Sequence, residues 1–371
     1  MFRRRQVIPV VRGERLLLLL GCLVVPGLIL AAEGSLALVE RRDPGEAESE
    51  SSGIDRLHRY SEAYGWEPRP GRYVEDGRVI TINDNGYRGE AAAEMPTPGR
   101  RRVVVLGDSV AFGLYASDHE TYAAALEDRD SGFEVLNLAV QGYGPDQALR
   151  RLEGLGLSLR PDVVVLGFCL GNDFADAMLP TFLFDEAHPK PFFTLEDGAL
   201  VKHDAHLRLP FRERTALWLE ENSRLYRRLT STPEREKERG RWLERRRLAT
   251  QDREATLSLV TRLVTSMRDV AASQGAAFLV LLHPDRPSAR AERWAEEFAA
   301  RLAAEGLRTI DLLDRYAERG LTFDEVTLDG LGHLSPPGHA ETASIVLEAL
   351  RDEGQQPTRV SLMGTPHPRP R

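Results

Sequence analysis

The stretch Val103-Val104-Val105-Leu106-Gly107-Asp108-Ser109 indicates the fold class of this 371-residue chain. Residues 102–106 form a short run of β-branched and aliphatic side chains, which is typical of a strand buried on both faces of a parallel sheet. Gly107 allows a tight turn, and Ser109 begins the helix that we expect next. The Ser109 hydroxyl is therefore predicted to lie at the carboxyl end of a strand, where α/β proteins place their functional groups.

Strand and helix patterns alternate along most of the remaining chain. Strands are predicted at residues 77–83, 133–138, 163–169, 276–282 and 308–312, and helices at 121–127, 146–157, 253–273, 291–305 and 338–350. Alternating strands and helices imply βαβ units. The predicted fold class is therefore α/β with a parallel sheet.

Composition divides the chain into four parts. Residues 1–32 are predicted to be a cytoplasmic stub and a transmembrane anchor, and residues 33–100 a polar tether followed by an N-terminal extension. Residues 101–353 carry the alternating pattern, which a helical insertion at about 183–250 interrupts. Residues 354–371 are polar and rich in proline, which predicts a disordered tail.

The N-terminal part predicts a membrane anchor. Residues 16–32 are apolar apart from glycine and one proline, and Arg3, Arg4, Arg5, Arg12 and Arg15 precede them. A run of this length is at the short end of what spans a bilayer. The arginines place the N-terminus in the cytoplasm, so the chain from about residue 33 is expected outside. A cleaved signal peptide is the alternative, because small residues occur at 31–32.

Charge and cysteine content limit the possible partners and cofactors. The formal net charge is −8, which argues against a dedicated nucleic-acid binder. The two cysteines, Cys22 and Cys169, have no partners at metal-ligand spacing. The cysteines therefore indicate no metal site, and the sequence makes no prediction of the oligomeric state.

Polar clusters at the predicted strand ends and in a late loop meet the needs of acyl transfer. Ser109 is the candidate nucleophile, His333 the base that takes its proton, and Asp329 the acid that orients the base. The backbone N–H groups of Ser109 and Gly142 and the side-chain amide of Asn172 are the candidate oxyanion donors. His339 is the weaker candidate for the base.

In these clusters the sequence resembles the SGNH (GDSL-type) hydrolase superfamily. Gly107-Asp108-Ser109-Val110 resembles its first block, and Gly142, Asn172 and His333 match the residues that define the later blocks. The resemblance covers roughly residues 101–350 apart from the insertion. It implies a flavodoxin-like three-layer sandwich and ester hydrolysis without a metal or an organic cofactor.

Two positions depart from the family pattern. Leu170 stands where the third block usually has glycine, and Gly330 stands where the last block has aspartate three residues before histidine. Asp329 is four residues before His333. The acid is therefore Asp329, Asp324 or no residue at all.

An arginine-rich segment at residues 224–247 has two interpretations. It holds nine arginines and one lysine against four glutamates. One interpretation is a solvated helix with charge pairs. The other is a basic cap that contacts anionic glycan or lipid headgroups.

The sequence predicts a serine esterase or deacylase that acts outside the cytoplasmic membrane. The expected substrate is an acyl ester, such as an O-acetyl group on a cell-envelope polysaccharide. Two alternatives are an O-acyltransferase of envelope glycan and a catalytically idle glycan-binding or assembly protein.

Overall fold

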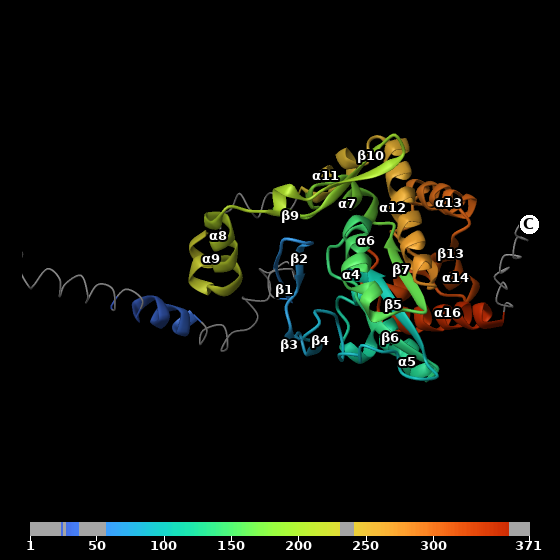
Figure 1. Ribbon diagram of the computed structural model, residues 1–371, viewed down its shortest axis with the longest axis horizontal. Coiled ribbons are helices and arrows are strands. Elements are labelled where there is room, and N and C mark those ends of the chain that lie inside the picture. Colours follow the sequence, from blue (N-terminus) through green and yellow to red (C-terminus); the bar gives the residue numbers. More distant parts are fainter. Residues whose placement is uncertain (1–23, 25–26, 37–56, 231–240, 356–371) are drawn as a thin grey trace, which may run out of the picture.

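The computed structural model describes residues 24, 27–36, 57–230 and 241–355. A five-stranded sheet occupies the centre of the larger part (Figure 1). Its strands are β5 (Arg101–Gly107), β6 (Phe133–Asn137), β7 (Val163–Cys169), β12 (Ala277–His283) and β13 (Arg308–Asp311). They are hydrogen-bonded in the order β13-β12-β7-β5-β6, and each pair is parallel. The predicted α/β class with a parallel sheet is confirmed.

The strand order places Ser109 at the position where the order of the strands reverses. If the five strands are numbered along the chain, their spatial order is 2-1-3-4-5, the order of flavodoxin-like folds. The chain leaves β5 for one edge and then crosses back to its other side. Ligands of such sheets bind outside the carboxyl ends of the strands at this reversal, and β5 ends directly before Ser109.

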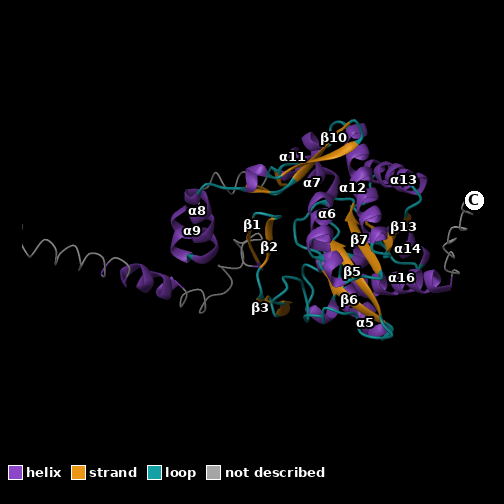
Figure 2. Cartoon of the chain, in the orientation of Figure 1, coloured by secondary structure: helices purple, strands orange, loops and turns teal. Residues whose placement is uncertain are grey.

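Helices cover both faces of the sheet (Figure 2). One face packs against α6 (Pro145–Gly154), α12 (Arg253–Ser273) and α13 (Ala289–Ala304), and the other against α5 (Tyr122–Arg129), α14 (Leu312–Glu318) and α16 (Pro336–Gln355). Because side chains alternate along a strand, Val104 and Leu106 enter the first core while Val103 and Val105 enter the second. All four side chains are buried, which explains the continuous apolar run in the sequence.

The insertion differs from its prediction as a helical segment. It begins with two β-hairpins, β8 (Thr181–Phe182) with β9 (Asp185–Pro189) and β10 (Phe192–Glu196) with β11 (Ala199–His203). The helical expectation was therefore wrong for this part. Asp197 and Gly198 both have positive φ, 50° and 78°, and an Asp-Gly pair of this kind favours a two-residue hairpin turn.

Among the described residues of the insertion, α-helices follow the hairpins. They are α8 (Phe211–Asn222), α9 (Arg224–Thr230) and α11 (Trp242–Ala249). In Figure 1, α8 and α9 stand apart from the sheet, near the N-terminal helix. The Glu33 carboxylate accepts hydrogen bonds from the Arg224 and Leu225 N–H groups at the start of α9.

The N-terminal extension contributes two more hairpins. They pair β1 (His58–Ser61) with β2 (Gly65–Pro68) and β3 (Gly71–Glu75) with β4 (Arg78–Ile82). Most of the predicted anchor, most of the tether and almost all of the predicted disordered tail lie outside the described residues. Within the described ranges, no helix combines the length and apolar character needed to cross a bilayer.

Candidate active site

Ser109 lies in a sharp turn between β5 and the short helix α4 (Ser109–Phe112). Gly107 has φ +144°, and a Cβ there would come within 2.5 Å of the Gly167 carbonyl oxygen on β7. Only glycine therefore fits the end of β5 at this position. Asp108 then caps α4, because its carboxylate accepts the Val110 N–H at 2.9 Å. The turn presents Ser109 at the carboxyl edge of the sheet.

The structure brings Ser109, His333 and Asp329 into one chain of hydrogen bonds. The Ser109 hydroxyl lies 2.9 Å from Nε2 of His333, although 224 residues separate them in sequence. Nδ1 of the same ring lies 2.6 Å from the Asp329 carboxylate. This is the arrangement in which a serine hydroxyl gives its proton to an imidazole that a carboxylate orients.

The local conformation of the loop explains the four-residue spacing between Asp329 and His333. One carboxylate oxygen of Asp329 accepts the N–H groups of Leu331 at 3.0 Å and His333 at 3.2 Å, and the other faces the imidazole. Gly332 has φ +86°, and a Cβ there would lie 2.4 Å from the Pro284 carbonyl oxygen. Asp324 is exposed in α15 (Phe323–Val326). Asp329 is therefore the acid that contacts the candidate base.

The surroundings of Asp329 favour its charged form. Partial burial acts to raise the pKa of its carboxyl, but the His333 ring and the N–H groups of Leu331 and His333 outweigh that effect, and the pKa is lowered. The carboxylate therefore stays ionised and keeps the hydrogen of the imidazole on Nδ1. This leaves Nε2 as the acceptor that faces Ser109.

His339 occupies a structural position. It is buried, and its Nδ1 accepts the Tyr122 N–H at 3.2 Å. Burial lowers the pKa of its imidazole to about 3, so the ring stays neutral and serves as a hydrogen-bond acceptor. Its role is to fix the start of α5 against α16.

Gly142 lies in a loop that packs against the serine turn. The Val140 N–H donates to the Gly107 carbonyl at 3.0 Å, which holds this loop beside β5. Gly142 has φ +77°, and a Cβ there would come within 2.6 Å of the Phe182 ring. A side chain at this position would therefore force either the loop or Phe182 to move. The backbone N–H of Gly142 remains a candidate oxyanion donor.

Asn172 lies at the end of β7 and is bonded to carboxylates. Its side-chain amide nitrogen lies 3.2 Å from Asp108, 3.3 Å from Asp173 and 2.9 Å from Asp176. The bond to Asp108 places Asn172 beside the serine turn. An amide has only two hydrogens, so these acceptors already use its donor capacity. In this structure Asn172 is close to the site but directed toward carboxylates.

Burial keeps these acids from ionising freely. It raises the pKa of Asp176 to about 7 and raises the pKa of Asp173 well above its usual range, with neighbouring carboxylates adding to the shift. Burial also raises the pKa of Asp108, against the opposing effect of the Val110 N–H. Nearby, the Lys190 ammonium forms a buried ion pair with Asp146. Part of the cluster therefore holds protons at neutral pH.

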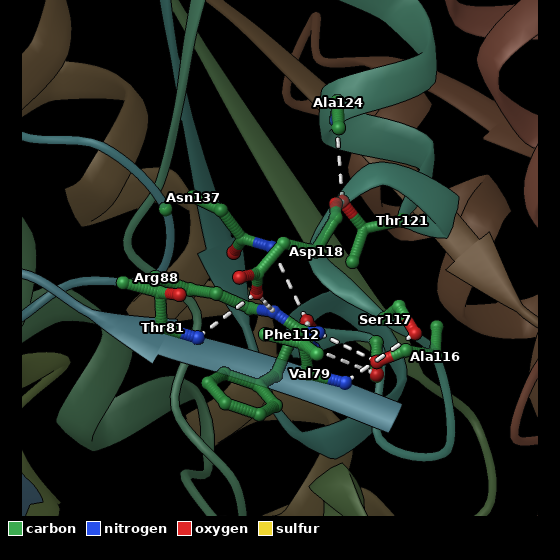
Figure 3. A network of polar contacts seen from close by, with 12 residues as sticks. Val79, Thr81, Arg88, Phe112, Ala116, Ser117, Asp118, Thr121, Ala124 and Asn137 are labelled. Atoms are coloured by element: carbon green, nitrogen blue, oxygen red, sulfur yellow. Dashed lines mark hydrogen bonds and ion pairs between the residues drawn. The ribbon is translucent and has the colours of Figure 1, made fainter. Parts of the chain in front are cut away.

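A buried arginine supports the helix that carries Ser109, and the sequence analysis did not identify it. Figure 3 shows Arg88 among the carbonyl groups that follow α4. Its guanidinium donates to the carbonyls of Phe112 at 2.9 Å, Gly113 at 2.8 Å and Ala116 at 2.6 Å, and it pairs with Asp118 at 3.0 Å. These bonds satisfy the open carbonyls at the end of α4.

Tyr115 is a second residue that the sequence analysis missed. Its ring meets the His333 ring edge to face, with 5.2 Å between the centroids, and it adopts φ +65°. Positive φ at a non-glycine residue carries strain that functional sites often retain. Arg88 lies between two glycines and Tyr115 follows the serine helix, but no motif marks either residue.

Within the described ranges, no three His, Cys, Asp or Glu side chains group as metal ligands.

Comparisons with known proteins find similarity only at the level of structure. No protein-family model and no curated sequence matches the chain. The chain is similar to a GDSL-like lipase from Bacteroides thetaiotaomicron, with 11% identity and a TM-score of 0.40 over 71% of this chain and 93% of that one. It is similar to a member of the lipolytic protein G-D-S-L family from Veillonella parvula, with 10% identity and a TM-score of 0.39 over 68% and 98%.

A third similar structure is a catalytic mutant of an acetylxylan esterase from Geobacillus stearothermophilus. It shares 11% identity and a TM-score of 0.37 over 67% of this chain and 93% of that one. All three TM-scores lie below 0.5. The function proposed below therefore rests on the geometry of the site.

Proposed function

We propose that this protein is a serine hydrolase of carboxylic esters with Ser109 as its nucleophile. The observation that carries the proposal is the unbroken chain from the Ser109 hydroxyl through both nitrogens of His333 to Asp329, with distances of 2.9 and 2.6 Å. Each member has the residue type and the contact that its role needs.

The reaction follows from these contacts. Nε2 of His333 takes the hydroxyl proton while the Ser109 oxygen attacks the ester carbonyl carbon, and the carbonyl oxygen becomes negative. The C–O bond to the alcohol then breaks, and His333 gives its proton to the departing oxygen. Water repeats the sequence on the acyl-serine and releases the acid. The N–H groups of Ser109 and Gly142 are the donors proposed to stabilise the oxyanion, with the Asn172 amide.

The intact chain of hydrogen bonds also bears on the alternatives. An idle binding protein has no need of a serine in contact with an imidazole that a partly buried carboxylate orients. Transfer of the acyl group to a sugar hydroxyl would use the same acyl-serine. No contact in the site favours a sugar acceptor over water, so hydrolysis is the function we propose.

The proposed location is outside the cytoplasmic membrane, with the N-terminus as a single-pass anchor. The support is the apolar run at residues 16–32 and the arginines before it. From this location we propose O-acyl groups on envelope polysaccharide as the natural substrate. Proteolysis of intact spheroplasts would test the location, because digestion of the domain requires that it face outward.

A fluorophosphonate probe tests the nucleophile directly. We expect the parent protein to be labelled on Ser109, and we expect a Ser109→Ala variant to be unlabelled and to hydrolyse 4-nitrophenyl acetate at the background rate. A Ser158→Ala variant is the control, since among the described residues its hydroxyl bonds the nearby Leu155 carbonyl alone. An unlabelled parent would exclude the proposed serine mechanism. Product analysis with added sugar acceptors would separate hydrolysis from transfer.

A further inference from the structure

A cavity of about 190 Å³ opens between α11 and α13. Leu170 and Gly171 form part of its wall, directly before Asn172. The loop after β12 forms another part through Asp285. Because β7 and β12 are adjacent parallel strands, the cavity lies at the carboxyl edge of the sheet, where α/β proteins bind ligands.

The cavity adjoins the loop that carries the candidate base. A Cβ built on Gly171 would lie 3.5 Å from the Leu331 carbonyl oxygen and 3.6 Å from the Asp285 carboxylate. Leu331 is two residues before His333. A group bound in the cavity would therefore lie next to the loop that carries His333.

The lining combines apolar side chains with arginines. Phe174, Leu170 and Trp294 contribute apolar surface. The charged lining residues are Arg246, Arg247, Arg290 and Asp285. The cavity also lies at the start of α13, and the positive end of a helix dipole favours anions.

The arginines are not equally neutralised by acids. Arg246 pairs with Asp285 at 2.5 Å, and Arg247 pairs with Glu244 at 2.6 Å. Arg290 instead donates to the neutral Thr250 hydroxyl at 3.1 Å, and its guanidinium lies 6.0 Å from the centre of the Trp294 ring. Among the described residues, no carboxylate forms a salt bridge with Arg290.

We propose that this cavity is a substrate subsite for a carboxylate group carried close to the scissile ester, with Arg290 as its principal cation. The inference rests on the proposed ester hydrolase. A planar guanidinium can bind a carboxylate through two parallel hydrogen bonds, and the apolar wall can contact the carbon skeleton that carries it. The subsite would select acidic esters, such as O-acylated acidic sugars, over neutral ones.

The test compares the full-length parent, Arg290→Gln and Arg290→Lys on matched esters. The pairs are 4-acetoxybenzoate with 4-acetoxybenzamide, which vary the alcohol side, and 4-nitrophenyl hemisuccinate with 4-nitrophenyl butyrate, which vary the acyl side. We expect Arg290→Gln to lower kcat/KM by about tenfold for whichever of the two anionic esters places its carboxylate in the cavity. A tenfold loss corresponds to a lost charged hydrogen bond of about 1.5 kcal/mol. The neutral esters should change by less than about twofold, within the effect of an exposed surface substitution. Arg290→Lys should retain part of the preference.

Arg293→Gln is the matched control, because this exposed arginine lies one turn along α13 and does not line the cavity. Binding of 4-acetoxybenzoate to the Ser109→Ala protein gives a readout that does not need catalysis. Arg290-dependent binding without any esterase activity would contradict the proposed function and support the subsite. Activity with equal effects of Arg290→Gln on anionic and neutral esters would overturn the subsite and leave the hydrolase proposal intact.

Discussion

The two sides of the candidate site differ in how far they are prepared for reaction. On the base side, the Ser109 hydroxyl, His333 and Asp329 are already in hydrogen-bond contact. On the oxyanion side, the Asn172 amide is bonded to carboxylates. In the proposed mechanism, the contacts for proton transfer are therefore already formed, whereas binding of the oxyanion would require Asn172 to exchange at least one acidic partner for substrate.

The same contrast holds for electrostatics. The acid on the base side is held ionised by its contacts, since the pKa of Asp329 is lowered. Burial raises the pKa of Asp108, Asp173 and Asp176 on the oxyanion side. A protonated carboxyl near a developing oxyanion is less unfavourable than a carboxylate, so raised pKa values suit this side of the site.

The largest effect among the variants below is expected on the base side, from Asp329→Asn. Asparagine can hold the imidazole in the wrong tautomer, and such a change in a Ser-His-Asp triad lowers kcat by about 10⁴-fold. We expect a loss of about 10³- to 10⁴-fold here, measured as kcat on 4-nitrophenyl acetate. Asp324→Asn is the control and should change kcat by less than about twofold, as exposed surface changes do. Similar rates for both variants would refute the role of Asp329.

A smaller loss of kcat is expected on the oxyanion side, from Asn172→Ala. Removal of one oxyanion donor typically costs about 100- to 1,000-fold in kcat. Because Asn172 also bonds Asp108 and Asp176, unfolding should be followed by circular dichroism beside the kinetics. Asn222→Ala, in the exposed helix α8, is the control. A loss explained entirely by the unfolded fraction would show that Asn172 only supports the structure.

Loss of the hydrogen bonds that support helix α4 should lower kcat moderately. Arg88→Met removes the donors to the carbonyls after α4, and we expect kcat to fall about tenfold through misplacement of Ser109. KM should change little, because Arg88 does not touch substrate. Arg102→Met is the control: Arg102 is equally buried and bonds several carbonyls, but at the start of β5. Equal kcat values for the two variants would contradict a positioning role for Arg88.

The smallest effect concerns stability and its dependence on pH. Folding raises the pKa of Asp176 to about 7, so the folded protein holds a proton that the unfolded chain releases near pH 4. Stability from this group is therefore full below that pH and is lost as the pH rises toward 7. Asp176→Asn should raise Tm by roughly 2–5 °C at pH 8.

At pH 5 the gain should be smaller than at pH 8, because the folded protein still holds the Asp176 proton and only the unfolded chain has released it. Scanning calorimetry at both pH values measures the difference. Asp285→Asn provides a contrast, since it removes a carboxylate paired with Arg246 and should not stabilise the protein at pH 8. An unchanged Tm difference between pH 5 and pH 8 would contradict a raised pKa for Asp176.

Local pattern was sufficient for most of the fold. Residues 253–273 were predicted as a helix and form α12 over the same range, because Asp252 caps its start and the apolar face repeats at helical spacing. The hairpins of the insertion were missed. Their strands are short and mixed in polarity, so the Asp197-Gly198 turn was the main local signal.

The sequence by itself determined the parallel α/β fold, the serine turn and the histidine loop. Apolar periodicity and the steric freedom of glycine act over a few residues, so they can be seen without knowledge of the rest of the chain. Tertiary structure alone decided that Asp329 bonds His333, that Asn172 faces carboxylates and that Arg88 holds α4. These outcomes depend on loop conformation and on contacts between segments far apart in sequence, which local pattern cannot encode.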